Sequence, residues 1–233
     1  MVGDMANYYQ NKLTVLHDSA ERIEEVFAAI RTEDRDVIDF NAIIPRPERL
    51  NIDNDGMAEI AMLWMINRAM PHNLNQFALM MAKRFEEWPD ERKKEVLEKA
   101  SELFRNIADY GYPDFYRWSI DHWGTKWNSF NGYSEMHRDG NTIYFETANG
   151  YCEPVIEELS RKFPDVGFSY AAADEDIGSW TIKGVFNNGE FKGLREHRTP
   201  AAYDIAFELF PEEKKNFRQK IDGTWEVIRD KED

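Results

Sequence analysis

The segment Asp121–Phe130, DHWGTKWNSF, holds the side chains with the clearest capacity to bind another molecule. Trp123 and Trp127 lie four residues apart around Gly-Thr-Lys. Two indole rings could stack on bases or on a partner's cation, while Lys126 contacts a phosphate. Strand alternation places Lys126 and Asn128 on the face opposite Trp127. We therefore take Trp123, Lys126, Trp127 and Asn128 as candidate binding residues.

The same aromatic rings could instead belong to a core. Trp118 and Trp123 fall near the end of a predicted helix, Gly124 is typical of a helix stop, and Trp127 begins an extended segment. Tryptophan buries a large apolar area and fills cores more often than sites. We favour this interpretation for the rings, which then seal a helical insertion onto a sheet, and keep Lys126 and Asn128 as the better functional candidates.

A second candidate is the acidic run Asp174, Glu175 and Asp176, within Ala173–Ser179. The run falls in a predicted hairpin connection and could bind a partner or a metal. More often such a run is a solvated turn whose carboxylates bond the backbone.

No metal site or cofactor is expected. Asn51, Asp53 and Asp55 have the spacing of a calcium loop, but Met62 stands where such a loop needs a bidentate glutamate. The five histidines form no H-x-x-x-H pair, and Cys152 is the single cysteine.

Two histidines leave an enzymatic alternative open. Asp121-His122 and His137-x-Asp139 would give carboxylate-oriented imidazoles if their segments meet in space, which suits a small hydrolase or transferase. Cys152 directly precedes a predicted helix, where the helix dipole lowers a thiol pKa. Free cysteines are usually buried and inert, and we favour that interpretation.

Composition limits the partners. The 233 residues are 42% hydrophobic and 14% aromatic, with a net charge of -15 and a pI near 4.8. This acidity disfavours binding to a nucleic-acid backbone and permits binding to a basic groove on a protein. The most apolar stretch, Met57–Met70, is interrupted by Glu59 and Arg68 and is too short to span a bilayer. With the lone cysteine, these features predict a protein of the cytoplasm.

The hydrophobic pattern predicts a strand over Tyr8–Leu16, a helix capped by Asp18, and a second strand over Val37–Ile44. Residues 53–123 have helical spacing, broken by prolines, and predict an insertion of four helices. Later elements are a hairpin of 132–137 with 141–147, a helix opened by Pro154, strands around 166–170 and 180–186, and a helical segment over 201–221.

This order predicts an α+β fold: a ferredoxin-like antiparallel sheet with helices on one face, interrupted by a helical insertion. One domain over 6–233 would be assembled from residues 6–52 and 124–233, with the insertion at 53–123.

Three segments carry a family resemblance: FNAIIPRPERL (Phe40–Leu50), DHWGTKWNSF with its WGTKWN core, and Ala148–Asp176, which contains GYCEPVIEELSRKFPDVGFSY. They resemble the Api92-like or YubB-type family carried by phages, prophages and plasmids. The resemblance implies a ferredoxin-like domain and an origin in a mobile element. The family has no assigned biochemical function, so no catalytic residue is carried over.

From these observations we expect a non-enzymatic accessory protein in the cytoplasm of a bacterial host, binding a host or defence protein through an acidic surface. The alternatives are a small hydrolase or transferase at His122 and His137, and single-stranded nucleic-acid binding by the sheet face. The second alternative needs a basic rim that the composition makes scarce.

Overall fold

The computed structural model describes residues 7–33, 35–52, 54, 56–70, 75–132 and 135–228. The chain forms two compact units. The sheet unit comprises Met1–Pro45 and Ser119–Asp233, and the helical unit comprises Arg46–Trp118. Each is described by itself.

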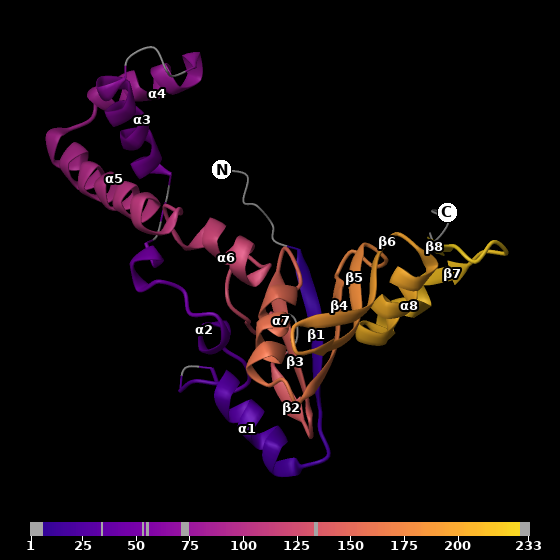
Figure 1. The fold of residues 1–233 in the computed structure, drawn as a ribbon. Coiled ribbons are helices and arrows are strands. Elements are labelled where there is room, and N and C mark those ends of the chain that lie inside the picture. The colour runs from indigo at the N-terminus through magenta and orange to yellow at the C-terminus, as the bar shows by residue number, and fades with distance from the viewer. Residues whose placement is uncertain are drawn as a thin grey trace. The chain divides into compact units, whose positions relative to one another are not determined.

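A six-stranded antiparallel sheet organises the sheet unit (Figure 1). Its order is β2-β3-β1-β4-β5-β6. The strands are β1 (Tyr8–Leu16), β2 (His137–Asp139), β3 (Thr142–Ala148), β4 (Gly167–Asp174), β5 (Trp180–Asn187) and β6 (Glu190–His197). Alternate residues of β1 are fully or largely buried, as the sequence pattern predicted for this strand.

The first four strands have ferredoxin-like connections. Helix α1 (Ala20–Ile30) follows β1, and α7 (Glu153–Lys162) joins β3 to β4, so the order along the chain is β-α-β-β-α-β with β1 and β3 central. The predicted α+β class is confirmed. Ser19, rather than Asp18, caps α1, because its side chain accepts from Arg22 N.

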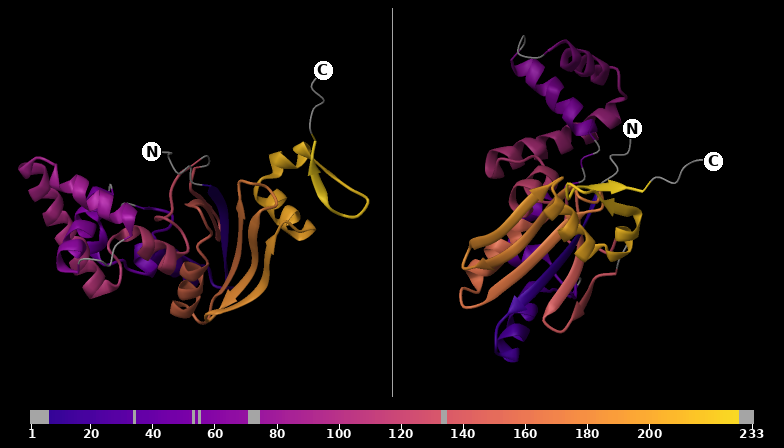
Figure 2. Two further views of the ribbon diagram at one scale, coloured as in Figure 1. Left: turned by 90° about the horizontal axis from the view of Figure 1, so that it is seen from above. Right: turned by 90° about the vertical axis from the view of Figure 1, so that its right-hand side faces the viewer.

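Helices cover both faces of the sheet, not one. Helix α7 contacts the face of the sheet that carries the Arg195 side chain, because the Arg195 guanidinium binds Glu153 at the start of α7. Helix α8 (Pro200–Leu209) contacts the opposite face, where Lys183 binds Glu208 on α8. Figure 2 shows α7 and α8 on opposite sides of the strands. Small side chains on β4, such as the fully buried Ala173, leave room for α8 to pack closely against this face.

The predicted second strand, Val37–Ile44, is wrong. The segment forms a single helical turn, α2 (Phe40–Ile43), in which the Asp39 side chain accepts from Asn41 N. Ile38, Phe40 and Ile43 are all buried, so the run is apolar on several sides and has no period that separates a strand from a helix.

The other differences lie at strand ends. Strand β2 begins only at His137, and Tyr133 and Ser134 of the predicted strand lie outside the described residues. The paired residues Asp139 and Thr142 make Gly140-Asn141 the turn of this hairpin. Strand β6 was not predicted.

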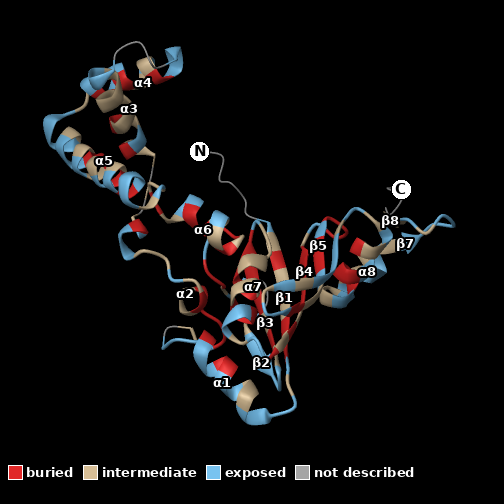
Figure 3. Cartoon of the chain, in the orientation of Figure 1, coloured by how far each residue is buried: buried red, intermediate tan, exposed pale blue. Residues whose placement is uncertain are grey.

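The predicted helical segment over 201–221 ends at Leu209. It is followed by the 3₁₀ helix η2 (Pro211–Asn216) and by a hairpin of β7 (Phe217–Gln219) and β8 (Trp225–Val227). Phe217 and Trp225 pack on α8 beside the buried Phe207. Figure 3 shows the buried residues on the sheet and beneath its helices.

The helical unit contains η1 (Glu48–Leu50), α3 (Met57–Ala69), α4 (Gln76–Glu86) and α5 (Asp90–Tyr110), and α6 (Phe115–Trp123) begins in it. The predicted four helices are therefore present. Ala61, Phe85 and Leu103 are fully or nearly fully buried in its core. Asp53, Asp55 and His72 lie outside the described residues.

Candidate functional site

The WGTKWN segment is mostly interior. Trp123 is fully buried, Lys126 is 4% exposed and Asn128 is 8% exposed, whereas Trp127 is 37% exposed. The segment is not a strand and does not alternate as predicted, because Thr125 and Ser129 are buried along with Lys126 and Asn128 and only Trp127 is exposed. The two rings have different environments, so they do not form one platform.

Trp123 belongs to the core. Its indole Nε1 donates to Ile44 O at 2.9 Å, and its ring meets that of Phe40 edge-on with centroids 5.8 Å apart. A buried indole with its N–H satisfied is a packing residue. This confirms the core interpretation for Trp123.

The rest of the segment lies along β3. Lys126 N donates to Ala148 O at 3.1 Å, and Phe130 exchanges backbone hydrogen bonds with Glu146. Asn128 binds a different element: its Oδ1 accepts from Phe40 N at 2.9 Å and its Nδ2 donates to Asp39 Oδ1 at 2.7 Å. These contacts hold the start of α2 against the sheet.

The acidic run is also largely used within the fold. Asp174 is 3% exposed and accepts from Asp176 N at 3.0 Å. Glu175 accepts from Tyr8 N at 2.9 Å, and Asp176 forms an ion pair with Arg198 at 3.1 Å. Burial and the nearby Asp174 raise the pKa of Tyr9. These contacts fasten the start of β1 to the end of β4 and join the β4–β5 connection to Arg198, which follows β6.

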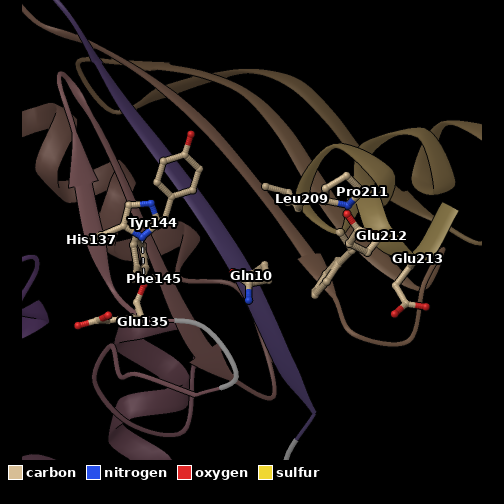
Figure 4. Close-up of a pocket in the computed structure, with 10 residues that line it drawn as sticks. Gln10, Glu135, His137, Tyr144, Phe145, Leu209, Pro211, Glu212 and Glu213 are labelled. Carbon is tan, nitrogen blue, oxygen red and sulfur yellow. Dashed lines mark hydrogen bonds between the residues drawn. The ribbon is translucent and has the colours of Figure 1, made fainter.

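A pocket of about 340 Å³ lies on the face of the sheet that carries α8. Figure 4 shows one wall from β1, β2 and β3 and the other from the end of α8 and η2. The lining residues are Gln10, Glu135, His137, Tyr144, Phe145, Leu209, Phe210, Pro211, Glu212 and Glu213.

The pocket combines an aromatic wall, an apolar wall and three carboxylates. His137 stacks on Tyr144 with ring centroids 4.8 Å apart and planes 13° apart. His137 Nδ1 lies 3.0 Å from Glu135 O. Glu135, Glu212 and Glu213 are the acidic residues among the described lining. Two cations lie close by: Lys215 pairs with Glu212 at 3.7 Å, and Lys12 Nζ lies 5.7 Å from the centre of the Tyr144 ring. Such a pocket can receive a cationic group with an apolar stem.

Sequence reasoning identified only His137 among these residues, and for a different chemistry. Gln10 and Tyr144 could have been found from alternation, since both occupy outward positions on paired strands. Glu212 and Glu213 could not have been found from the sequence, because their segment was predicted as a continuous helix.

The enzymatic candidates are not gathered in the pocket. His137 lines it, whereas His122 does not. Cys152 is fully buried, with its Sγ 3.4 Å from Tyr170 OH, and burial raises the pKa of its thiol to about 12. This is the inert structural cysteine that we favoured.

Within the described residues, no three His, Cys, Asp or Glu side chains are arranged to hold a metal ion. Of the helices in the described part of the chain, none has the length and apolar character that crossing a membrane requires.

No family model and no curated protein matches the chain. Among solved structures, protein api92 from Yersinia pseudotuberculosis, of family DUF1281, aligns with 83% of this chain and 99% of its own. The sequence identity is 9% and the TM-score is 0.33. At this TM-score we derive neither the fold nor the function of the chain from the alignment.

Proposed function

We propose that this protein is a binding module whose acidic pocket receives an arginine or lysine side chain from a basic segment of a partner protein. The observation that supports the proposal is the joint presence of three carboxylates and an aromatic wall around one cavity. Each part has a role for such a ligand.

The carboxylates of Glu135, Glu212 and Glu213 would pair with the cationic head. Tyr144 would contribute the apolar edge of its ring, because the ring is already stacked on His137 and lies 5.7 Å from Lys12 Nζ. Leu209 and Phe210 would cover the methylene stem, which long basic side chains bury against apolar surface. A volume of about 340 Å³ is enough for one such side chain.

The biological setting belongs to the same proposal. The family resemblance of the FNAIIPRPERL and WGTKWN segments supports an accessory protein of a phage, prophage or plasmid, acting in the cytoplasm of its bacterial host. The net charge of -15 supports a basic protein partner of host or defence origin, because long-range attraction speeds the encounter of opposite charges.

Fluorescence anisotropy with a labelled arginine-rich peptide tests the pocket. The double variant Glu212→Gln, Glu213→Gln removes two charges and keeps the side-chain size. The control Glu95→Gln, Glu98→Gln removes the same charge from the exposed surface of α5. We expect about tenfold weaker binding in the pocket variant only, as the loss of close charge pairs implies.

A third variant, Tyr144→Leu, separates the aromatic contact from the charge and should also weaken binding. Equal losses in the pocket variant and the surface control would show that overall acidity, not the pocket, binds the peptide. Tight binding of a single-stranded oligonucleotide in place of the peptide would support the nucleic-acid alternative.

A further inference from the structure

Strand β6 is an edge strand of the sheet that the described residues form. It is the last strand in the order β2-β3-β1-β4-β5-β6, so among the described residues it pairs only with β5. Most of its eight residues are exposed, including Leu194 at 51%. Figure 2 shows the β5–β6 hairpin at the margin of the sheet. A long exposed edge offers unpaired N–H and C=O groups to another strand.

The hairpin determines which residues offer those groups. A two-residue turn, Asn188-Gly189, joins the paired residues Asn187 and Glu190. In such a hairpin the closing pair is hydrogen-bonded, and hydrogen-bonded pairs then alternate along the ladder. The even-numbered residues of β6 therefore bond to β5. Phe191, Gly193, Arg195 and His197 direct their backbone groups outward.

We propose that a second copy of this chain pairs with β6 in antiparallel orientation, with the two-fold axis at Leu194. Hydrogen bonds between the two copies can join only the odd-numbered residues, whose backbone groups point outward. An odd-numbered residue lies opposite another odd-numbered residue only when the two-fold axis passes through a residue, not between two residues. Placing it at Leu194 puts Lys192 opposite the partner's Glu196, and the two-fold symmetry repeats this pair on the other side of the axis. Leu194 then meets the partner's Leu194 as a non-hydrogen-bonded pair, where side chains are closest.

The neighbouring registers are opposed by charge. An axis at Gly193 puts Glu190 opposite the partner's Glu196. An axis at Arg195 puts that residue opposite its own copy. An axis at Lys192 puts two lysines together. Like charges directly opposite each other destabilise a strand pair, so among the axes from Lys192 to Arg195 only the one at Leu194 avoids them.

Cysteine cross-linking of the full chain tests the register. In Leu194→Cys, the two new thiols face each other across the axis, within the range that a disulfide spans. The native Cys152 is fully buried and does not compete. Under mild oxidation we expect a non-reducing gel band at twice the chain mass of 27.5 kDa.

The matched control is Lys183→Cys, an exposed position on β5 directly opposite Leu194 and outside the proposed interface. In the proposed pairing its two copies are three strand spacings apart, or about 14 Å, which is too far for a disulfide. Absence of the band in Leu194→Cys, or equal bands in both variants, would overturn the proposal.

Sedimentation equilibrium tests the pairing without a cross-link. The mass of the unmodified chain should rise from 27.5 kDa toward twice that value with concentration. Lys192→Glu should remain monomeric, and adding Glu196→Lys should restore the rise. Far-UV circular dichroism verifies the fold, because Glu196 also accepts from Thr199 Oγ1 at 2.6 Å. A monomeric unmodified chain, or an unchanged Lys192→Glu dimer, would refute the pairing.

Discussion

Asn128 completes the hydrogen bonds of two separate backbone segments. Its amide oxygen accepts from Phe40 N and from Ser129 N, both at 2.9 Å, and its amide nitrogen donates to Asp39. Asp39 in turn accepts from Asn41 N at 2.8 Å. The Asn128 side chain, a candidate for ligand binding, is thus fully engaged in holding the start of α2, which follows α1.

Replacing Asn128 by alanine should therefore destabilise the protein. The change leaves the buried Phe40 N–H without its acceptor and removes one donor from the Asp39 carboxylate. We expect the free energy of unfolding to fall by about 2–3 kcal/mol. Urea denaturation followed by circular dichroism measures this loss.

Trp127→Ala is the matched control in the same segment. The Trp127 ring is 37% exposed and meets the Phe130 ring edge-on, with ring centroids 6.1 Å apart. Its removal should therefore lower the free energy of unfolding by about 1 kcal/mol or less. A larger loss for Trp127→Ala than for Asn128→Ala would contradict the assignment of roles within the segment.

At the scale of elements, the β5–β6 hairpin depends on its turn. Asn188 and Gly189 have φ angles of 46° and 80°, as a type I′ turn requires. Gly189 N also donates to Ser160 Oγ at 2.8 Å, which fastens the turn to α7. A Cβ at position 189 would lie 2.7 Å from the Arg161 Nε.

Gly189→Ala should lower the free energy of unfolding by about 1–2 kcal/mol, because an L side chain is strained at positive φ. Thermal or urea denaturation measures it. Asn188→Gly, which relieves strain at the neighbouring position, should change stability by about 0.5 kcal/mol or less. No loss in Gly189→Ala would show that the turn does not constrain the hairpin.

This hairpin also shows what sequence reasoning can and cannot find. Asn188-Gly189 between alternating residues is a strong hairpin signal, so β6 was predictable although we did not predict it. The alternation of β1 and the start of α7 at Pro154 are predictable because each is a local pattern.

The elements that the sequence did not predict correctly depend on contacts between residues far apart in the sequence. Val37–Ile44 is buried on several sides, and its contacts with the distant residues Asn128 and Trp123 help to hold it as a helical turn. Likewise, the pocket joins Tyr144 to Glu212 and Glu213, which are about half the sheet unit apart in sequence. Nothing in either segment alone indicates the other.

At the scale of the whole molecule, the chain carries 44 acidic and 29 basic residues, so each exposed cation has two effects. It reduces the overall repulsion, and it can bind one particular carboxylate. Arg22 on α1 does both: it contacts Asp165, just before β4, at 2.7 Å. Arg105 on α5 is exposed and serves as a cation of the same charge for comparison.

Arg22→Gln should lower the melting temperature at pH 7 more than Arg105→Gln does, because both variants lose one charge and only the first loses this ion pair. The hydrogen bond from Arg22 holds the pKa of Asp165 below its ordinary value of 3.8. A carboxyl with a lowered folded pKa stabilises the fold above its unfolded pKa, and this contribution disappears as the pH falls through the folded pKa. The gap between the two variants should therefore be full at neutral pH and close below pH 3.8. Differential scanning fluorimetry across this range measures it, and equal losses at pH 7 would mean that only the overall charge matters.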